Sequence, residues 1–283
     1  MKDLKRRAGT FTISIAGLVA LLSLAYHPWF QYAVVAIVAA LAAVAIWEYE
    51  QFAKAKGGQM ILPALMALTV LESLAFYVAA QVPLLRYLPQ VVFFIGFLIL
   101  FALHFRQKDG AVVDLAVSSF GLLYIAVPMG MLLGILYLPL LETPFDGRWW
   151  VIYLLTVTKI TDVGAYFAGN LWGRRKLAPS ISPGKTVEGA IFGLLCAIGA
   201  SYFFHLFSQS VDASFHLSAR ESLTLGVILG CTGQFGDLSE SLLKRDANKK
   251  DSNALPGLGG VLDAIDSLLF NAPIIYFYLT YVR

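Results

Sequence analysis

The chain alternates between long apolar runs and short polar segments. A helix that crosses the hydrocarbon core of a bilayer needs roughly 20 mainly apolar residues, and nine runs approach or exceed that length. They are Phe11–Tyr26, Trp29–Trp47, Met60–Ala80, Tyr87–Phe105, Ala111–Tyr137, Trp149–Leu171, Val187–Phe207, Ser222–Leu243 and Val261–Val282. The pattern therefore predicts about nine transmembrane helices.

Composition supports the same fold class. Of the 283 residues, 58% are hydrophobic and 14% are charged, whereas soluble domains average about 25% charged residues. We therefore expect an all-α polytopic integral membrane protein and no nucleic-acid partner. The two cysteines and four histidines lack metal-ligand spacing, so neither a disulfide framework nor a zinc site is expected.

Positive charge in the polar segments predicts the orientation of the helices, because short cytoplasmic loops hold an excess of Lys and Arg. With the N-terminus placed inside, sixteen of the 21 Lys and Arg residues fall on the cytoplasmic side, four fall outside, and Lys159 lies within a helix. The N-terminus is therefore predicted to be cytoplasmic. The first apolar run is expected to stay as a helix rather than to be removed as a signal peptide.

Residues 1–141 carry few charges within their apolar runs. Glu72 and Asp114 are the exceptions, and we interpret this region as an N-terminal transmembrane scaffold. At the end of the second run, Glu48 and Glu50 stand beside Trp and Tyr residues. A functional role for these two carboxylates is open, but solvated side chains at the membrane interface are the preferred interpretation.

Residues 142–283 differ, because polar residues recur at helical spacing within the apolar runs. One set is Lys159, Asp162, Tyr166 and Asn170, and a second is Gln234, Asp237, Ser241 and Lys244 with Glu240 beside it. Each set falls on one helix face, and charges at membrane depth are costly without a function. Two polar stripes predict a catalytic region, with a Lys159–Asp162 pair that only helps helices to associate as the alternative. Repeated glycines in the seventh and eighth runs predict close helix packing. They are Gly189 and Gly193 in the seventh run and Gly226, Gly230, Gly233 and Gly236 in the eighth.

Two cytoplasmic loops accompany these stripes. Loop 172–186 contains Lys185 after a Pro-Gly turn, where an ammonium group and backbone amides can bind an anion at the start of the next helix. It matches neither a Walker A loop nor the complete set of S-x-x-K acyl-enzyme motifs. Loop 244–260 precedes Asp263 and Asp266, whose spacing places both on one side of a helix. Their carboxylates suit a hard cation such as Mg²⁺, with stabilisation of the helix N-terminus as the alternative.

These residues favour one kind of chemistry. Cations can hold phosphates, carboxylates can hold a metal, and no nucleophile is paired with a general base. Phosphoryl or nucleotidyl transfer to a lipid at the cytoplasmic membrane face fits this set of groups. Such reactions depend mainly on positioning the reactants and neutralising charge.

Several motifs resemble those of a known family, the phosphatidate cytidylyltransferases or CDP-diacylglycerol synthases. The motifs are S-x-L-K-R at Ser241–Arg245, K-D at Lys250–Asp251, P-G-x-G-G at Pro256–Gly260 and D-x-x-D at Asp263–Asp266, with the similar segments LAPSISPGKTVEG and GQFGDLSES upstream. The resemblance is strong from Asp162 to Asp266 and reaches the N-terminal half only through hydropathy.

The resemblance implies an enzyme that joins CTP and phosphatidate to give CDP-diacylglycerol and pyrophosphate in phospholipid biosynthesis. It also implies a homodimer among the lipids of the inner membrane, an active site on the cytoplasmic side, and Mg²⁺ as cofactor with K⁺ as an additional candidate. Carried over by position, the implied catalytic residues are Lys185, Asp237, Lys244, Arg245, Asp263 and Asp266, of which Asp237, Asp263 and Asp266 are also the implied metal ligands. The implied substrate-binding residues are Ser182, Thr186, Glu188, Glu240, Lys250 and Asp251.

Three departures from the family pattern leave other functions open. Leu258 stands where the family usually has histidine, Ala264 where it has arginine, and the segment before Pro256 is one residue shorter. A related CTP-dependent polyprenol or lipid kinase, or a cytidylyltransferase for another lipid phosphate, is the alternative among enzymes. A small-solute or ion transporter is the alternative of another class, because transporters place charges near the membrane midplane.

Overall fold

The computed structural model describes residue 17 and residues 19–105, 109–138, 146–210, 215–249 and 260–282, which are almost entirely helical. The helices are α2 (Phe30–Ala55), α3 (Leu62–Gln81), α4 (Leu88–His104), α5 (Ala111–Gly121), α6 (Val127–Tyr137), α7 (Gly147–Trp172), α8 (Val187–Ser210), α9 (Ala219–Asp246) and α10 (Val261–Tyr281). Shorter elements are the 3₁₀ turn η1 (Pro83–Leu85), the π-helical turn η2 (Leu122–Ala126), and the strands β1 (Lys176–Ala178) and β2 (Ser182–Thr186), which pair antiparallel with Lys176 opposite Thr186 and Ala178 opposite Ser182.

The eight apolar runs after the first are confirmed as helices. The run 111–137 is built from α5, η2 and α6 in succession. Pro128 lies in the first turn of α6 and has no N–H to bond back to the preceding turn, so the regular ladder of helical hydrogen bonds is interrupted there. The first predicted run, Phe11–Tyr26, falls mostly outside the described residues.

Seven helical segments of the described chain are long and apolar enough to cross a membrane. The 28-residue α9 is not one of them, because charged and polar side chains recur along it. The polytopic, all-α membrane fold is therefore confirmed. The number of crossings and the side on which the N-terminus lies stay predictions.

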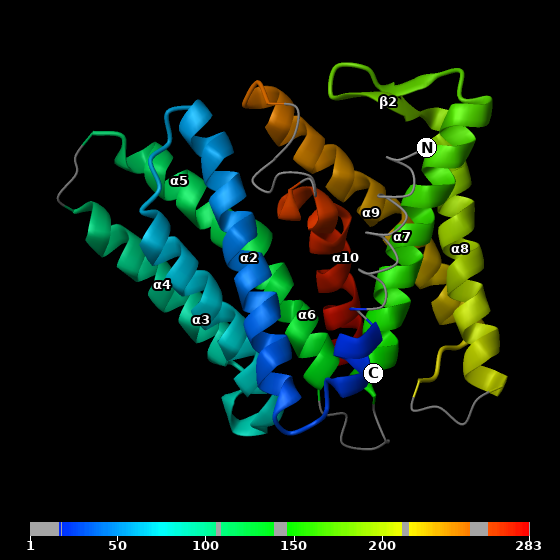
Figure 1. Ribbon diagram of the computed structural model, residues 1–283, viewed down its shortest axis with the longest axis horizontal. Coiled ribbons are helices and arrows are strands. Elements are labelled where there is room, and N and C mark those ends of the chain that lie inside the picture. Colours follow the sequence, from blue (N-terminus) through cyan, green and yellow to red (C-terminus); the bar gives the residue numbers. More distant parts are fainter. Residues whose placement is uncertain are drawn as a thin grey trace.

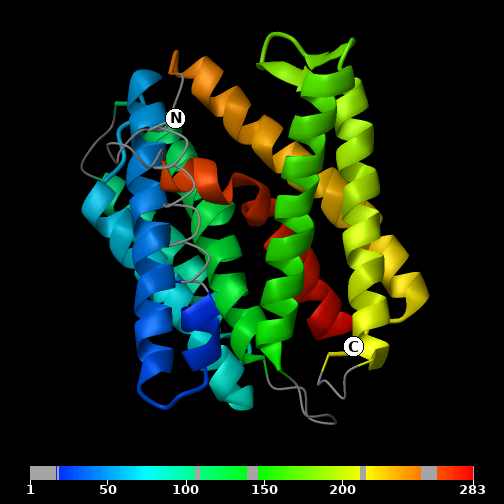
Figure 2. The ribbon, with the colours of Figure 1, turned by 45° about the vertical axis from the view of Figure 1, so that its right-hand side comes forward.

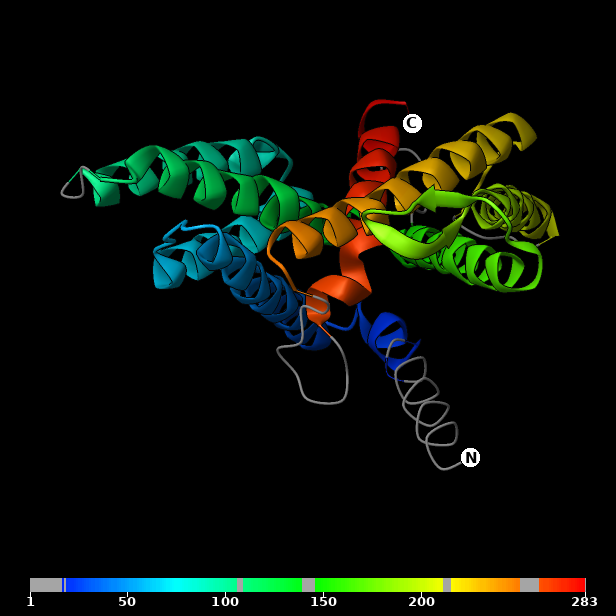
Figure 3. The same ribbon diagram turned by 90° about the horizontal axis from the view of Figure 1, so that it is seen from above.

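Two groups of helices pack on either side of α10 (Figure 1). In one group α3 packs against α2, α4 and α6, and in the other α8 packs against α7 and α9. α10 contacts α6 on one side and α7 and α9 on the other, and the turned view shows it between the two groups (Figure 2). Seen from above, α9 crosses α10 (Figure 3), and its glycines meet α10 between Asp266 and Asn271. The two helices that carry the predicted metal-binding carboxylates, α9 and α10, thus pack against each other.

Glycines let the helices around the site approach closely. A Cβ atom added to Gly189 of α8 would lie 2.6 Å from the carbonyl oxygen of Ala165 on α7. A Cβ atom added to Gly236 of α9 would lie 2.7 Å from the carbonyl oxygen of Asp266 on α10. Both distances are shorter than van der Waals contact, so the predicted packing role of these glycines is confirmed.

The β1–β2 hairpin projects from the end of the second helix group (Figure 1). It fills most of loop 172–186, where the sequence predicted no strand. Glu188, in the first turn of α8, accepts the backbone N–H groups of Arg174 and Arg175 at 3.1 and 3.2 Å. This contact fixes the chain where it enters the hairpin.

Candidate functional site

A polar cavity of about 290 Å³ lies beside the hairpin, between α7, α8 and α9. Its polar lining residues are Asp162, Tyr166, Asn170, Ser182, Lys185, Thr186, Gln234 and Asp237. The structure thus brings together the polar stripe of α7, the loop that carries Lys185, and the polar stripe of α9. The helical spacing predicted that the two stripes form one site, and the family resemblance implied that Lys185 belongs to it.

Lys185 and Asp237 form an ion pair in this cavity, with Nζ of the lysine 2.7 Å from Oδ2 of the aspartate. Lys185 stands near the end of β2, and α8 begins two residues later. The hydroxyl of Thr186 accepts the N–H of Gly189 at 3.1 Å and so caps the first turn of α8. An ammonium group beside a helix N-terminus is a favourable environment for a phosphate group.

Three carboxylates lie within electrostatic range of one another beside this ion pair. Asp162 of α7 and Asp266 of α10 both interact with Asp237 of α9. Lys159 supplies a second positive charge. Its Nζ lies 3.7 Å from the carboxylate of Asp162 and donates a hydrogen bond to the carbonyl oxygen of Ala264 at 3.1 Å.

Asp263 belongs to a separate charge cluster with Lys244 and Glu240 of α9. Nζ of Lys244 lies 2.6 Å from Asp263 and 2.5 Å from Glu240, whose side chain is 1% exposed. Asp263 and Asp266 therefore contact different neighbours, although their spacing predicted one side. Residues three apart in a helix are separated by about 4.5 Å along the helix axis. Asp263 therefore lies beside Lys244, and Asp266 lies beside Gly236.

Asp263 pairs with Lys244, whereas Asp237 pairs with Lys185 and interacts with Asp266. Among the described residues, no three Asp, Glu, His or Cys side chains are arranged to hold a metal ion together. Asp237 and Asp266 nevertheless offer two carboxylates, and Asp162 adds a third negative charge nearby. These donors fit Mg²⁺, which usually takes one or two carboxylates and completes its shell with water and substrate phosphates.

Two other predicted residues contact the hairpin rather than the carboxylates. Nε of Arg245 donates to the carbonyl oxygen of Ile181 at 3.1 Å, which ties the end of α9 to the turn between the strands. Glu188 holds the backbone at the start of the hairpin, as described above. The remaining predicted residues Lys250 and Asp251, and the P-G-x-G-G segment with Leu258, lie outside the described part of the chain.

Glu48 of α2 supports the site in a way that the sequence did not reveal. Its carboxylate is fully buried and accepts the backbone N–H groups of Val261 at 2.8 Å and Leu262 at 2.7 Å. These are the first residues of α10, where N–H groups have no partner within the helix. Glu48 thereby fixes the helix start that carries Asp263 and Asp266.

The interpretation of Glu48 and Glu50 as solvated side chains is wrong. Glu50 is 3% exposed, and its Oε1 lies 3.0 Å from Nζ of Lys54. Both carboxylates are stabilised inside the protein, by backbone N–H groups for Glu48 and by an ammonium group for Glu50. The signal in the sequence was two acidic residues continuing an apolar run, but the partner of Glu48 lies 213 residues away.

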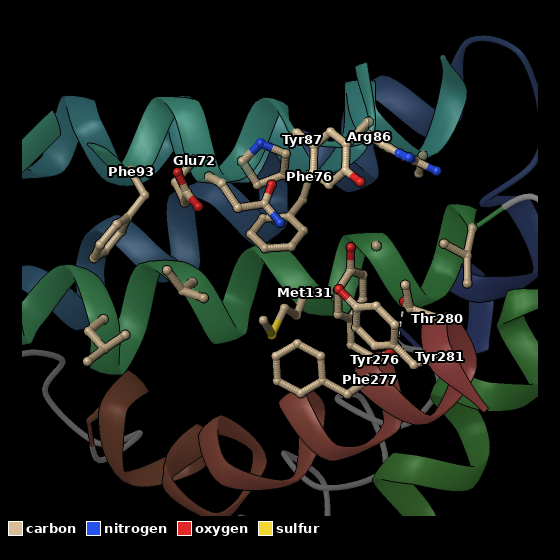
Figure 4. Close-up of a pocket in the computed structure, with 18 residues that line it drawn as sticks. Glu72, Phe76, Arg86, Tyr87, Phe93, Met131, Tyr276, Phe277, Thr280 and Tyr281 are labelled. Atoms are coloured by element: carbon tan, nitrogen blue, oxygen red, sulfur yellow. Dashed lines mark hydrogen bonds between the residues drawn. The ribbon is translucent and has the colours of Figure 1, made fainter. Parts of the chain in front are cut away.

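A larger cavity, of about 610 Å³, lies between α3, α4, α6 and α10 (Figure 4). Figure 4 shows Glu72 and Phe93 toward one end of it and Arg86 and Thr280 toward the other. Glu72 is 3% exposed, and its Oε2 has no hydrogen-bond partner among the described residues. The lining of this cavity contains no predicted site residue from the described chain, so we do not assign the active site to it.

Comparison with known protein families identifies the family of this chain. The model of the cytidylyltransferase family matches residues 5–282. The chain belongs to this family. The resemblance that the motifs of the second half indicated is thereby confirmed, and it extends through the N-terminal half of this cytidylyltransferase-family protein.

Relatives of this cytidylyltransferase-family protein carry a more specific name. A phosphatidate cytidylyltransferase of Chlamydia pneumoniae is 35% identical to it, over 98% of this chain and 92% of that protein. The phosphatidate cytidylyltransferase of Bacillus subtilis (strain 168) is 45% identical over 47% of this chain and 48% of that protein. That of Haemophilus influenzae is 41% identical over 48% of this chain and 47% of that protein.

Proposed function

We propose that this protein is a phosphatidate cytidylyltransferase, an integral membrane enzyme that condenses CTP with phosphatidate to give CDP-diacylglycerol and pyrophosphate. The observation that carries the proposal is the polar cavity in which Lys185 and Asp237 meet, with Asp266 beside them, inside a helical membrane protein. Groups suited to phosphate and groups suited to a hard cation lie together there. The similarity to the Chlamydia pneumoniae protein over most of both chains supports the same function.

In this reaction an oxygen of the phosphatidate phosphate attacks the α-phosphorus of CTP. The bond between that phosphorus and the oxygen bridging to the β-phosphorus breaks, and pyrophosphate leaves with the electron pair. The attacking oxygen is already ionised near neutral pH, so no side chain has to remove a proton. Positioning and charge neutralisation then account for most of the catalysis.

We assign Lys185, Ser182 and Thr186 to the phosphates of CTP, because all three line the polar cavity at the start of α8. In the structure the ammonium group of Lys185 is paired with Asp237. Nucleotide phosphates would share that ammonium group and leave the carboxylate of Asp237 available to a cation. Lys244 and Arg245 stay candidates for contacts with substrate phosphates.

We expect Mg²⁺ at this site, with Asp237 and Asp266 as its carboxylate ligands and K⁺ as an additional candidate ion. When bound, the cation supplies neutralisation of the charge on the phosphates. We assign Asp263 a different task, because its carboxylate already holds the ammonium group of Lys244. Asp263 would position Lys244 rather than bind the metal.

We further propose that the protein lies in the inner membrane with its site toward the cytoplasm, and that it forms a homodimer. Basic residues gather around the hairpin and the end of α9, at the end of the molecule where the polar cavity lies, and they include Arg174, Arg175, Lys176, Lys244 and Arg245. Cytoplasmic segments carry such an excess of positive charge, which supports this orientation. The homodimer follows from the family resemblance alone.

The test is synthesis of CDP-diacylglycerol by the purified protein in detergent with labelled CTP, phosphatidate and Mg²⁺. We expect a labelled CDP-lipid and pyrophosphate from the unaltered protein, and a loss of about 100-fold or more in Asp266→Asn. Asp246→Asn is the matched control, because Asp246 is an exposed residue of α9 paired with Lys56. Mg²⁺-dependent CTP binding without a CDP-lipid would indicate another lipid acceptor, and absence of CTP binding would refute the proposal.

A further inference from the structure

Lys159 occupies an unusual position for a charged residue. It stands twelve residues after Gly147 and thirteen before Trp172, the ends of α7, so its Cα lies about 18–20 Å from either end of a membrane-spanning helix. Its side chain is nevertheless 53% exposed. A lysine exposed at membrane depth is costly and is retained where it meets an anion or lines a functional cavity.

The described contacts of Lys159 do not use all the N–H donors of its ammonium group. An ammonium group has three N–H donors. Within the described chain, Lys159 donates one hydrogen bond, to the carbonyl oxygen of Ala264, and forms a looser ion pair with Asp162 at 3.7 Å. The alternative in which Lys159 serves only to neutralise Asp162 explains neither this separation nor the exposure. The ammonium group therefore retains a donor for a ligand.

Lys159 also links two cavities of opposite character, because it lines the apolar one and pairs with Asp162, which lines the polar one. On one side is an apolar cavity of about 630 Å³, lined by Lys159 itself, by Trp149, Ile152 and Leu155 of α7, and by Leu22. Asp162, one turn further along α7, lines the polar cavity that holds Lys185. A volume of this size is within the range of about 300–1,000 Å³ that ligand sites occupy.

The charged groups at the other end of the apolar cavity neutralise each other and leave Lys159 as the candidate to bind an anion. Asp146 and Arg148 line that end and form an ion pair with each other at 2.6 Å. Arg148 precedes Lys159 by eleven residues, a rise of about 16 Å along the helix. The residues of α7 that line the cavity between them are mainly apolar, and the ammonium group of Lys159 lies 3.7 Å from Asp162, a residue of the polar cavity.

We propose that the apolar cavity holds an acyl chain of the lipid substrate and that Lys159 binds its phosphate monoester, a role that rests on the proposed function. The two lysines then have separate tasks. Lys185 serves the nucleotide in the polar cavity, and Lys159 presents the lipid phosphate at the boundary between the cavities. The ammonium group of Lys159 donates to the carbonyl oxygen of Ala264. Because the side chain of Ala264 is uncharged, it offers no cation of its own to the lipid phosphate.

The test measures the Michaelis constant for each substrate separately in Lys159→Met, which keeps the length of the side chain and removes its charge. We expect KM for phosphatidate to rise about tenfold to a hundredfold, the factor that loss of a hydrogen bond to a charged group usually costs. KM for CTP should change less than about twofold, and Lys159→Arg should restore most of the affinity for phosphatidate. Lys56→Met is the matched control, because Lys56 pairs with Asp246 at the surface and lines neither cavity.

A second variant tests the cavity itself. Leu155→Trp should reduce the use of long-chain phosphatidate more than that of a dihexanoyl analogue, because the added ring fills the apolar space. Glycerol 3-phosphate, which has the phosphate without the chains, should compete poorly with either lipid. Melting temperatures close to that of the unaltered protein would show that both variants are folded.

The outcomes separate this proposal from the proposed function. An unchanged KM for phosphatidate in Lys159→Met, or a rise in KM for CTP alone, overturns the assignment of Lys159 to the lipid. If the unaltered protein makes no CDP-lipid, the proposed function fails. Equilibrium binding of labelled phosphatidate, without CTP, then still decides on Lys159, because the methionine variant should bind less of it.

Discussion

Glu48 provides a sharp test of how the two helix groups cooperate. Its two carboxylate oxygens accept the first two N–H groups of α10, and the side chain is fully buried. A hydrogen bond to a charged group contributes about 1.5–3 kcal/mol, so two such bonds amount to about 3–6 kcal/mol. Relief from burying the carboxylate offsets part of this in Glu48→Ala, and we expect a loss of about 3 kcal/mol. At roughly 2–4 °C per kcal/mol, the melting temperature should fall by about 6–12 °C.

The effect on activity should exceed the effect on stability. Asp263 and Asp266 follow Leu262 by one and four residues, so a shift of the helix start moves both carboxylates. A displacement of about 1 Å can lower a rate by about 100-fold. Glu48→Gln keeps one acceptor oxygen and should lose less stability than Glu48→Ala, yet we expect its kcat for CDP-diacylglycerol synthesis to fall by about tenfold or more.

Glu50→Gln is the matched control for this experiment. Glu50 is as deeply buried on the same helix, but it pairs with Lys54 and not with α10. Thermal unfolding in detergent and steady-state kinetics should be measured on both glutamine variants. A Glu48→Gln protein with the kcat of the unaltered enzyme, or one affected no more than Glu50→Gln, would refute the assigned role of Glu48.

Three further predictions follow from the same structure. Lys244→Met leaves the buried Glu240 without its cation and should lower stability by about 3–5 kcal/mol, whereas adding Glu240→Gln should recover much of that loss in a double-mutant cycle of melting temperatures. Gly236→Ala places a Cβ against the backbone of α10 and should lower stability by about 1–3 kcal/mol, with a loss of activity because Asp266 moves; full activity would show that α9 and α10 adjust freely. Glu72→Met removes a buried carboxyl oxygen that has no described partner, so the melting temperature should stay equal or rise and kcat should be unchanged; a loss of activity would instead reveal a ligand in the cavity of Figure 4.

The helices could be predicted from sequence because hydropathy is a local property. Each apolar run from Trp29 onward is long enough to form its own helix, and each did. The hairpin was missed because its entry is fixed by a contact between Glu188 and the backbone of Arg174 and Arg175. A contact between a side chain and a backbone N–H group leaves no periodic pattern in the sequence.

The site was predictable only in part, for a related reason. Helical spacing identified which residues share a face, and the two faces that carry Asp162 and Asp237 do line one cavity. Lys185, which lines the same cavity, lies outside any helix, so its place there could not follow from spacing. Spacing does not identify which partner a face meets. The pairing of Asp263 with Lys244 and the contact of Glu48 with the start of α10 both depend on how the helices are arranged in the bundle.

Because α10 lies between the two helix groups, the bundle cannot complete its folding before α10 has been synthesised. It follows all the other described helices in the chain, yet it lies at the centre of the bundle and contacts both helix groups (Figure 2). Until the ribosome has released Val261 and Leu262, the carboxylate of Glu48 has no N–H groups of α10 to accept, and α6 and α9 lack the contacts that each of them makes with α10. The nascent protein should therefore mature in one late step, in which insertion of α10 closes the bundle and delivers Asp266 to the site at the same time.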